Sequence, residues 1–260
     1  MKYYVVSDVH GFYPELEAAL RESGFFEEKE PRKLIICGDL FDRGKETLKM
    51  QEFILDLMKK DELILIRGNH EDLILELATN LDKWMKLGIL NTHHYRNGTL
   101  DTLLTLTGMT LEEAYDAPDE CAKRFRETVF FNKIIPAMKD FYETENYIFV
   151  HGWIPCFALG RGSRTSDFTY LPDWRELGES AWEAARWYNG MRVASEGVLE
   201  PLKTIVCGHF HASYGHSVLD GKGSEFEEDA DFSPYYAEGI CAIDACTAHT
   251  GKINCVVIED

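Results

Sequence analysis

The segment KLIICGDLFDRG, residues 33–44, joins a short apolar run to two acids and an arginine set between glycines. The same arrangement, an apolar run followed at once by polar residues, occurs in KYYVVSDVHG (2–11) and in ELILIRGNHE (62–71). Helix-like stretches, residues 14–23 and 46–59, separate these runs. An alternation of strand and helix at this spacing predicts a parallel α/β sheet with right-handed crossovers.

The rest of the chain follows this rhythm less closely. Further apolar runs predict strands at residues 147–150, 204–207, 241–245 and 254–259. No long helix separates the last two, so we expect them to form an antiparallel pair in a second sheet. Amphipathic segments over about residues 72–145 predict a helical cap inserted into one domain that spans residues 1–260. For residues 156–200 we expect a loop followed by a helix at 179–188.

Composition limits the classes of protein to consider. The chain has 260 residues, 45% of them hydrophobic, which is enough for a large core. A net charge of −18 argues against nucleic acid as a partner. The seven cysteines contain no C-x-x-C pair, which favours reduced thiols over a disulfide framework. The sequence contains neither a signal peptide nor an apolar run of ~18 residues, so we expect a cytoplasmic protein with no membrane partner.

Polar clusters follow five of the predicted strands. In an open α/β sheet, the carboxyl ends of the strands line the crevice in which ligands bind. We therefore expect these side chains to meet at one place. The candidates, in chain order, are Asp8, His10, Asp39, Asp42, Arg43, Asn69, His70, Glu71, His151, His209 and His211.

The chemistry of this set points to metal ions. Carboxylates, imidazoles and an amide oxygen, without thiolates, suit divalent ions such as Mn, Fe or Zn. The donors are too many for one ion but sufficient for two that share a carboxylate. Two metals ~3.5–4 Å apart are an arrangement used for in-line displacement at phosphorus. The residues therefore predict two divalent cations and a phosphoesterase.

The order of the motifs resembles a known superfamily. D-x-H-G at 8–11, G-D-x-x-D-R-G at 38–44, G-N-H-E at 68–71, then H-G at 151 and G-H at 208 are similar to the calcineurin-like metallophosphoesterases. The D-R-G and N-H-E forms resemble the phosphoprotein phosphatase branch, including its bacterial members and the symmetrical diadenosine tetraphosphate hydrolases. The resemblance implies a two-sheet β-sandwich flanked by helices, a four-layer α/β/β/α fold.

The resemblance also implies a role for each motif residue. One metal would be held by Asp8 and His10, and the other by Asn69, His151 and His209, with Asp39 bridging the two. His70 would protonate the leaving group after in-line attack by a metal-bridging hydroxide, and Asp42 would orient its imidazole. Arg43 would bind the phosphate oxygens. Glu71 is expected to form local hydrogen bonds.

Two features depart from the family pattern. The last motif reads GHFH, and His211 either completes the first metal site or stands outside it. The second phosphate-binding arginine is assigned to Arg186, with Arg161, Arg164 and Arg192 as alternatives. We interpret His93 and His94, in the cap, as surface or packing residues.

The expected substrate is a phosphorylated protein or small phosphorylated molecule. The first hypothesis is a phosphatase that cleaves phosphoserine, phosphothreonine or phosphotyrosine. The alternative is a hydrolase of dinucleoside polyphosphates such as diadenosine tetraphosphate. A non-catalytic scaffold is the third hypothesis, and the presence of His70, Asp42 and Arg43 disfavours it.

Overall fold

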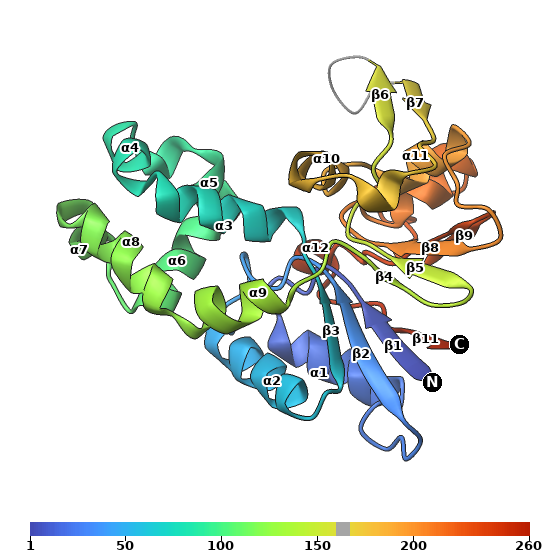
Figure 1. Ribbon diagram of the computed structural model, residues 1–260, viewed down its shortest axis with the longest axis horizontal. Coiled ribbons are helices and arrows are strands. Elements are labelled where there is room, and N and C mark those ends of the chain that lie inside the picture. Colours follow the sequence, from blue (N-terminus) through green and yellow to red (C-terminus); the bar gives the residue numbers. More distant parts are fainter. Residues whose placement is uncertain (160–166) are drawn as a thin grey trace.

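Two β-sheets packed face to face form the centre of the computed structural model, which describes residues 1–159 and 167–260 (Figure 1). The first sheet has the strand order β11-β1-β2-β3. Strands β1, β2 and β3 run parallel, and β11 pairs antiparallel with β1. Their bounds are β1 Lys2–Val6, β2 Arg32–Cys37, β3 Leu63–Ile66 and β11 Val256–Glu259.

The second sheet has the order β4-β5-β8-β10-β9. Its three inner strands are parallel, and β4 and β9 pair antiparallel at the two edges. The bounds are β4 Tyr142–Glu143, β5 Tyr147–Phe149, β8 Thr204–Cys207, β9 Tyr235–Ala237 and β10 Ile240–Ala242.

Side chains that alternate along the strands build three apolar layers. Along β1, Tyr3 and Val5 face the second sheet, whereas Tyr4 and Val6 face the helices on the outside. The inner layer is completed from the second sheet by residues such as Phe149, Val206 and Cys241. Successive strand residues point to opposite faces of a sheet, and an apolar layer covers each face. Every inner strand is therefore buried on both sides. This explains why these strands read as continuous apolar runs.

Helices cover both outer faces of the sandwich (Figure 1). On the first sheet lie α1 (Tyr13–Glu22) and α2 (Thr47–Lys59), whose buried residues include Leu16 and Ile54. On the second lie α10 (Glu179–Ala185) and α11 (Gly190–Ser195), with η3 (Trp174–Glu176). The predicted four-layer α/β/β/α architecture is thereby confirmed.

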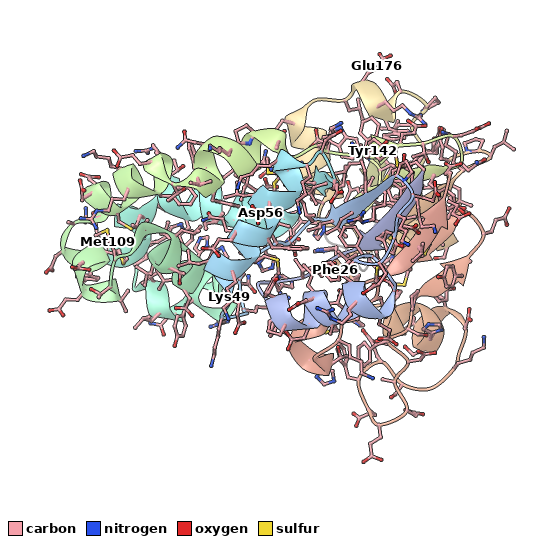
Figure 2. The ribbon with its side chains drawn as sticks, turned by 90° about the horizontal axis from the view of Figure 1, so that it is seen from below. Phe26, Lys49, Asp56, Met109, Tyr142 and Glu176 are labelled. Atoms are coloured by element: carbon pink, nitrogen blue, oxygen red, sulfur yellow. The ribbon has the colours of Figure 1, made fainter. Side chains whose placement is uncertain are left out.

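A helical segment follows β3 and extends away from the sheets (Figure 1). Figure 2 shows Met109, between α6 and α7, at the end of this segment farthest from Tyr142 of β4. Its elements are α3 Asn69–Thr79, α4 Leu81–Lys86, η1 Ile89–Asn91, α5 His93–Arg96, α6 Thr99–Thr107, α7 Leu111–Asp116, α8 Pro118–Glu127, η2 Phe130–Ile134 and α9 Ile135–Ala137. We call residues 69–137 the cap.

The last strands differ from the prediction. β10 and β11 do not pair with each other; β10 joins β8 and β9, whereas β11 crosses to the free edge of β1. The short helix α12 (Thr247–Thr250) lies between them and redirects the chain. Apolar runs show that two segments are strands, but the partner of each depends on which sheet edge is open.

The region between β5 and β8 also holds more structure than expected. A hairpin of β6 (Phe157–Leu159) and β7 (Asp167–Thr169) precedes the predicted helix, which ends at Ala185. Arg161 and Arg164 lie outside the described residues. After β8, η4 covers Gly215–Leu219.

Two further predictions concern the state of the cysteines and the presence of membrane-spanning helices. All seven cysteines are free thiols, and five of them are buried. This agrees with the prediction that they are not a disulfide framework. Among the helices of residues 1–159 and 167–260, none combines the length and the apolar character that crossing a bilayer requires.

Substitution of Gly38, which follows β2, tests how tightly the two sheets pack around their strand ends. A methyl group there would lie 2.4 Å from His151 Nδ1, at a backbone φ of +83°. Gly24 has the same φ, but nothing lies within 4 Å of the corresponding position. We expect Gly24→Ala to cost about 1 kcal/mol of unfolding free energy from the left-handed backbone alone. Gly38→Ala should cost about 3 kcal/mol or more, because contact with His151 is added.

Urea unfolding of the two variants measures this difference. Equal losses would show that the strand ends have more room than the structure indicates.

Candidate metal centre

The carboxyl ends of β1, β2 and β3 meet the start of α3 and the short helix α12 near the middle of the molecule (Figure 1). The residues after β5 and β8 reach the same place from the second sheet: His209 N donates to Asp8 Oδ2 (2.9 Å), and His151 Nε2 lies 3.4 Å from Asp39 Oδ1. The predicted convergence of strand ends from both sheets is therefore present in the structure.

Asp39 lies between two groups of possible ligands. Its Oδ1 is near His151, and its Oδ2 is 3.6 Å from His10 Nε2. Two sets of side chains could each hold an ion, with ligand atoms within 4.8 Å of one another, and Asp39 belongs to both. The sets are His10, Asp39 and His70, and Asp39, His151 and His209. A carboxylate shared in this way is the arrangement that a pair of metal ions needs.

Hydrogen bonds fix which ring nitrogen of two histidines faces the centre. His10 Nδ1 lies 2.9 Å from the Phe41 carbonyl, and His151 Nδ1 lies 2.8 Å from the Cys37 carbonyl. Since only a protonated nitrogen can donate to a carbonyl, each neutral ring presents an Nε2 lone pair inward. The inward Nε2 of His151 lies 2.8 Å from another acceptor, Asn69 Oδ1. Lone pairs that point toward one another need a cation between them. The residues around the centre therefore fit two metal ions.

Burial shifts the pKa values at the centre in a consistent way. It raises the pKa of Asp39 well above its usual value and lowers the pKa values of His10 and His209 well below theirs. Asp8 raises the pKa of Asp39 further, and His70 lowers that of His10. A bound cation favours both the ionised carboxylate and the neutral imidazole, so cations and protons compete for this site.

The backbone at the centre is unusually strained. Nine non-glycine residues in the described ranges have a positive φ, and six of them carry these motifs. Such backbone costs free energy in most residue types and persists only where the surroundings fix it. The six are Asp8, His10, Asp39, Asp42, Arg43 and His209.

His70 and Asp42 form a buried pair beside the centre. His70 Nδ1 lies 2.6 Å from Asp42 Oδ2. Burial lowers the pKa of His70, but Asp39 and Asp42 outweigh it, and the net pKa is raised. The exposed Arg43 lies with its guanidinium 2.7 Å from His10 Nε2 and 3.3 Å from His70 Nε2. Nε2 of His70 and a forked guanidinium thus face the same space.

Several residues at the centre were not predicted. Thr99 and Thr102 of α6 donate to the two oxygens of Asp42, at 2.8 and 2.6 Å. Asp244 follows β10 and is buried; burial, with Asp8 as a further cause, raises its pKa well above its usual value. Thr247 Oγ1 donates to the Asp8 carbonyl. Asp244 obeys the strand-end rule and could have been found, whereas neither threonine follows a strand.

Glu71, beside the pair, has the local role expected of it. Its carboxylate accepts the backbone N–H groups of Gly68, Asp39 and Leu40 at 2.7, 3.1 and 2.9 Å.

Two predicted residues have partners outside the centre. His211 Nε2 lies 2.7 Å from Glu225 Oε1, and its ring packs on Phe210 and Phe226. Arg186 is 2% exposed, and its guanidinium donates to three carboxylates: Asp72, Asp140 and Glu179. Arg192 Nε donates to Glu196. We therefore do not retain His211 among the proposed ligands or Arg186 in the proposed phosphate site.

Thr102 provides a test of how the cap supports the pair. Its hydroxyl donates to Asp42 Oδ1 and accepts the Asp42 N–H at 3.0 Å. Thr102→Val should lower kcat about 10-fold, because the Asp42 carboxylate loses the group that positions it. Bound metal should stay unchanged. Thr107→Val is the matched control on the same helix, since Thr107 donates only to helix carbonyls. Steady-state kinetics and metal analysis measure both; equal effects of the two changes would contradict the role of Thr102.

Known proteins resemble the chain in both sequence and fold. The model of the family described as calcineurin-like phosphoesterase matches residues 1–213. A symmetrical bis(5'-nucleosyl)-tetraphosphatase of Buchnera aphidicola is 39% identical over 71 residues, 27% of this chain and 24% of that protein. The asymmetrical bis(5'-nucleosyl)-tetraphosphatase PrpE of Bacillus subtilis is 24% identical over 206 residues, 73% of this chain and 75% of that protein. The chain thus matches about a quarter of the length of the first of these relatives.

Solved structures agree on the fold. A cold-active protein-tyrosine phosphatase of a Shewanella species aligns with a TM-score of 0.54 and 17% identity, over 100% of this chain and 75% of that one. A serine/threonine phosphatase from Saccharomyces cerevisiae aligns with a TM-score of 0.52 and 12% identity, over 100% and 80%. The centre shared by two sheets and the match over residues 1–213 lead to one conclusion: the chain belongs to the calcineurin-like phosphoesterase family.

Proposed function

We propose that this protein hydrolyses phosphate monoesters at a dinuclear metal centre and acts on phosphorylated serine, threonine or tyrosine in proteins. The observation that carries the proposal is the buried His70–Asp42 pair, at 2.6 Å, beside the centre. A protonated imidazole is most useful where the leaving group is an alkoxide, which is too basic to depart without a proton. A phosphoanhydride releases a much weaker base and has less need of such an acid.

The proposed ligands divide into two sets around a shared carboxylate. Manganese is the first choice, with iron or zinc as alternatives, because the donors are carboxylates, imidazoles and an amide. When bound, the two cations polarise the phosphoryl oxygens and promote ionisation of the attacking water. The sets are Asp8 and His10 for one ion and Asn69, His151 and His209 for the other, with Asp39 in both.

The remaining residues bind the phosphate and move a proton. Arg43 binds the non-bridging oxygens through the forked face of its guanidinium. His70 gives its Nε2 proton to the leaving oxygen, while Asp42 holds Nδ1–H and stabilises the charged ring. Thr99 and Thr102 hold Asp42 through both carboxylate oxygens.

Hydrolysis of dinucleoside polyphosphates is the second candidate. It is favoured by the relatives of Buchnera aphidicola and Bacillus subtilis, both named bis(5'-nucleosyl)-tetraphosphatases. The same centre serves both reactions, so the residues around it decide between them.

A direct comparison of substrates separates the two. Purified protein supplied with Mn²⁺ should release phosphate from phosphoserine and phosphothreonine peptides with a higher kcat/KM than it shows for diadenosine tetraphosphate. Chromatography of the nucleotide products and a phosphate assay measure the two rates. Cleavage of the dinucleotide well above peptide turnover would reverse the order of the proposals, and inactivity on both with Mn²⁺, Fe²⁺ and Zn²⁺ would refute the centre itself.

His70→Asn tests the acid within the first proposal. Loss of the proton donor should lower turnover of alkyl phosphate esters by roughly 10²–10⁴-fold. Nitrophenyl phosphate should lose much less, because its leaving group needs little protonation. The ratio of the two losses is the measurement, and the same loss on both esters would rule out His70 as the acid.

A further inference from the structure

Three side chains meet in the cap, and one of them lies on the same helix as Asn69 and His70 of the proposed centre. Glu76 lies on α3, and His93 and His94 open the short helix α5. Each offers one ligand atom, and these atoms lie within 4.8 Å of one another. His94 Nε2 is 2.9 Å from Glu76 Oε2, and the two imidazole rings have centroids 4.0 Å apart.

His94 is the member that packing alone does not explain. Its side chain is 0% exposed; Nδ1 has no hydrogen-bond partner in the described part of the chain, and Nε2 has the carboxylate of Glu76 beside it at 2.9 Å. Buried polar atoms without partners are rare in native proteins and indicate a bound ion or water. The buried imidazole lies against a carboxylate and a second imidazole.

The carboxylate of Glu76 is held in place by neighbours. Trp84 Nε1, from α4, lies 3.1 and 3.0 Å from its two oxygens, and Asn80 Nδ2 donates to Oε1 at 3.0 Å. The Trp84 ring also packs edge-on against both histidines, at centroid distances of 5.4 and 4.8 Å. Hydrogen bonds that orient a ligating carboxylate are typical of protein metal sites.

We propose that Glu76, His93 and His94 form a third metal site, separate from the dinuclear centre and selective for borderline transition metals of the Zn²⁺ class. Two imidazoles and a carboxylate suit Zn²⁺, Ni²⁺ and Cu²⁺ better than Mg²⁺ or Ca²⁺. Ligand atoms 2.0–2.1 Å from a tetrahedral Zn²⁺ lie roughly 3.4 Å apart, so small side-chain rotations suffice. Glu76 is 41% exposed, which leaves the ion open to solvent on one side.

The site would link the cap to the active centre. An ion there joins α3 to α5, and the chain after α5 runs through Gly98 into α6. A methyl group at Gly98 would lie 2.4 Å from the backbone nitrogen of Arg43, so the two segments are in contact. Thr99 and Thr102, which hold Asp42, follow directly. Occupancy of the cap site therefore stiffens the segment that supports the His70–Asp42 pair.

Counting bound zinc tests the proposal without using activity. Wild-type protein, stripped by chelator and titrated with Zn²⁺, should bind one equivalent more than His93→Ala, as measured by calorimetry and elemental analysis. His93 is exposed, so its loss should leave the fold intact. His216→Ala is the control: this histidine is partly exposed and lies 3.8 Å from a carboxylate oxygen of Asp231. It should leave the zinc count unchanged.

Trp84 gives a local readout of the same ion. Ni²⁺ and Cu²⁺ quench tryptophan fluorescence at short range, so Ni²⁺ should quench Trp84 in the wild type and in Asp39→Asn, which disables the dinuclear centre. Adding His93→Ala to Asp39→Asn should abolish this quenching, and Trp84→Phe should remove its source.

The outcomes separate the two metal proposals. Two results together support the cap site even if the proposed reaction is wrong. His93→Ala binds one equivalent of zinc fewer and loses the quenching of Trp84, whereas Asp39→Asn keeps the zinc of the cap site and the quenching of Trp84. An unchanged zinc count in His93→Ala, or quenching that persists when His93→Ala is added to Asp39→Asn, overturns the cap site and leaves the dinuclear centre unaffected.

Discussion

The carboxylate of Asp39 is 2% exposed and lies between imidazoles that approach both of its oxygens. Removing a carboxylate from water costs several kcal/mol unless charge or hydrogen bonds replace the water. The backbone N–H of His70 donates to Asp39 Oδ1 at 3.0 Å and supplies part of this replacement. Metal ions held by the two ligand sets would supply the rest, because the facing histidines present lone pairs. The surroundings of one buried carboxylate thus fit a pair of ions and require both sheets to hold their positions around it.

The fold meets this demand through tight strand ends. Glu71 gathers three backbone N–H groups on one carboxylate, which fixes the turn after β2 against the start of α3. At Gly68 a methyl group would lie 2.2 Å from Asp39 Oδ1, so the backbone itself forms one wall of the site. The free energy stored in the left-handed residues around it is offset by the apolar layers between and outside the sheets. Strain at this place is the consequence of bringing five strand ends to one point.

The features that depend on local sequence could be predicted. Strands β1 to β3, their helices and the metal-binding motifs follow from apolar runs and from polar residues at strand ends. The partners of β10 and β11 did not follow, because pairing depends on which edge the assembled sheets leave open. Arg186 illustrates the same limit: its three carboxylate partners, Asp72, Asp140 and Glu179, come from three separate segments. Thr102 reaches Asp42 over sixty positions of chain, a contact that only the assembled fold brings about.

The charges around the centre bear on the choice of substrate. The protein has a net charge of −18, and the buried guanidinium of Arg186 is neutralised by carboxylates. Positive charge toward a substrate then comes from Arg43 and from the cations of the centre. Such a field acts on phosphates bound near the centre, since charges beyond about 10 Å are largely screened at ordinary ionic strength. A single phosphorylated side chain and a short chain of phosphates would both lie within that range, so the residues around the centre decide between the two substrate classes.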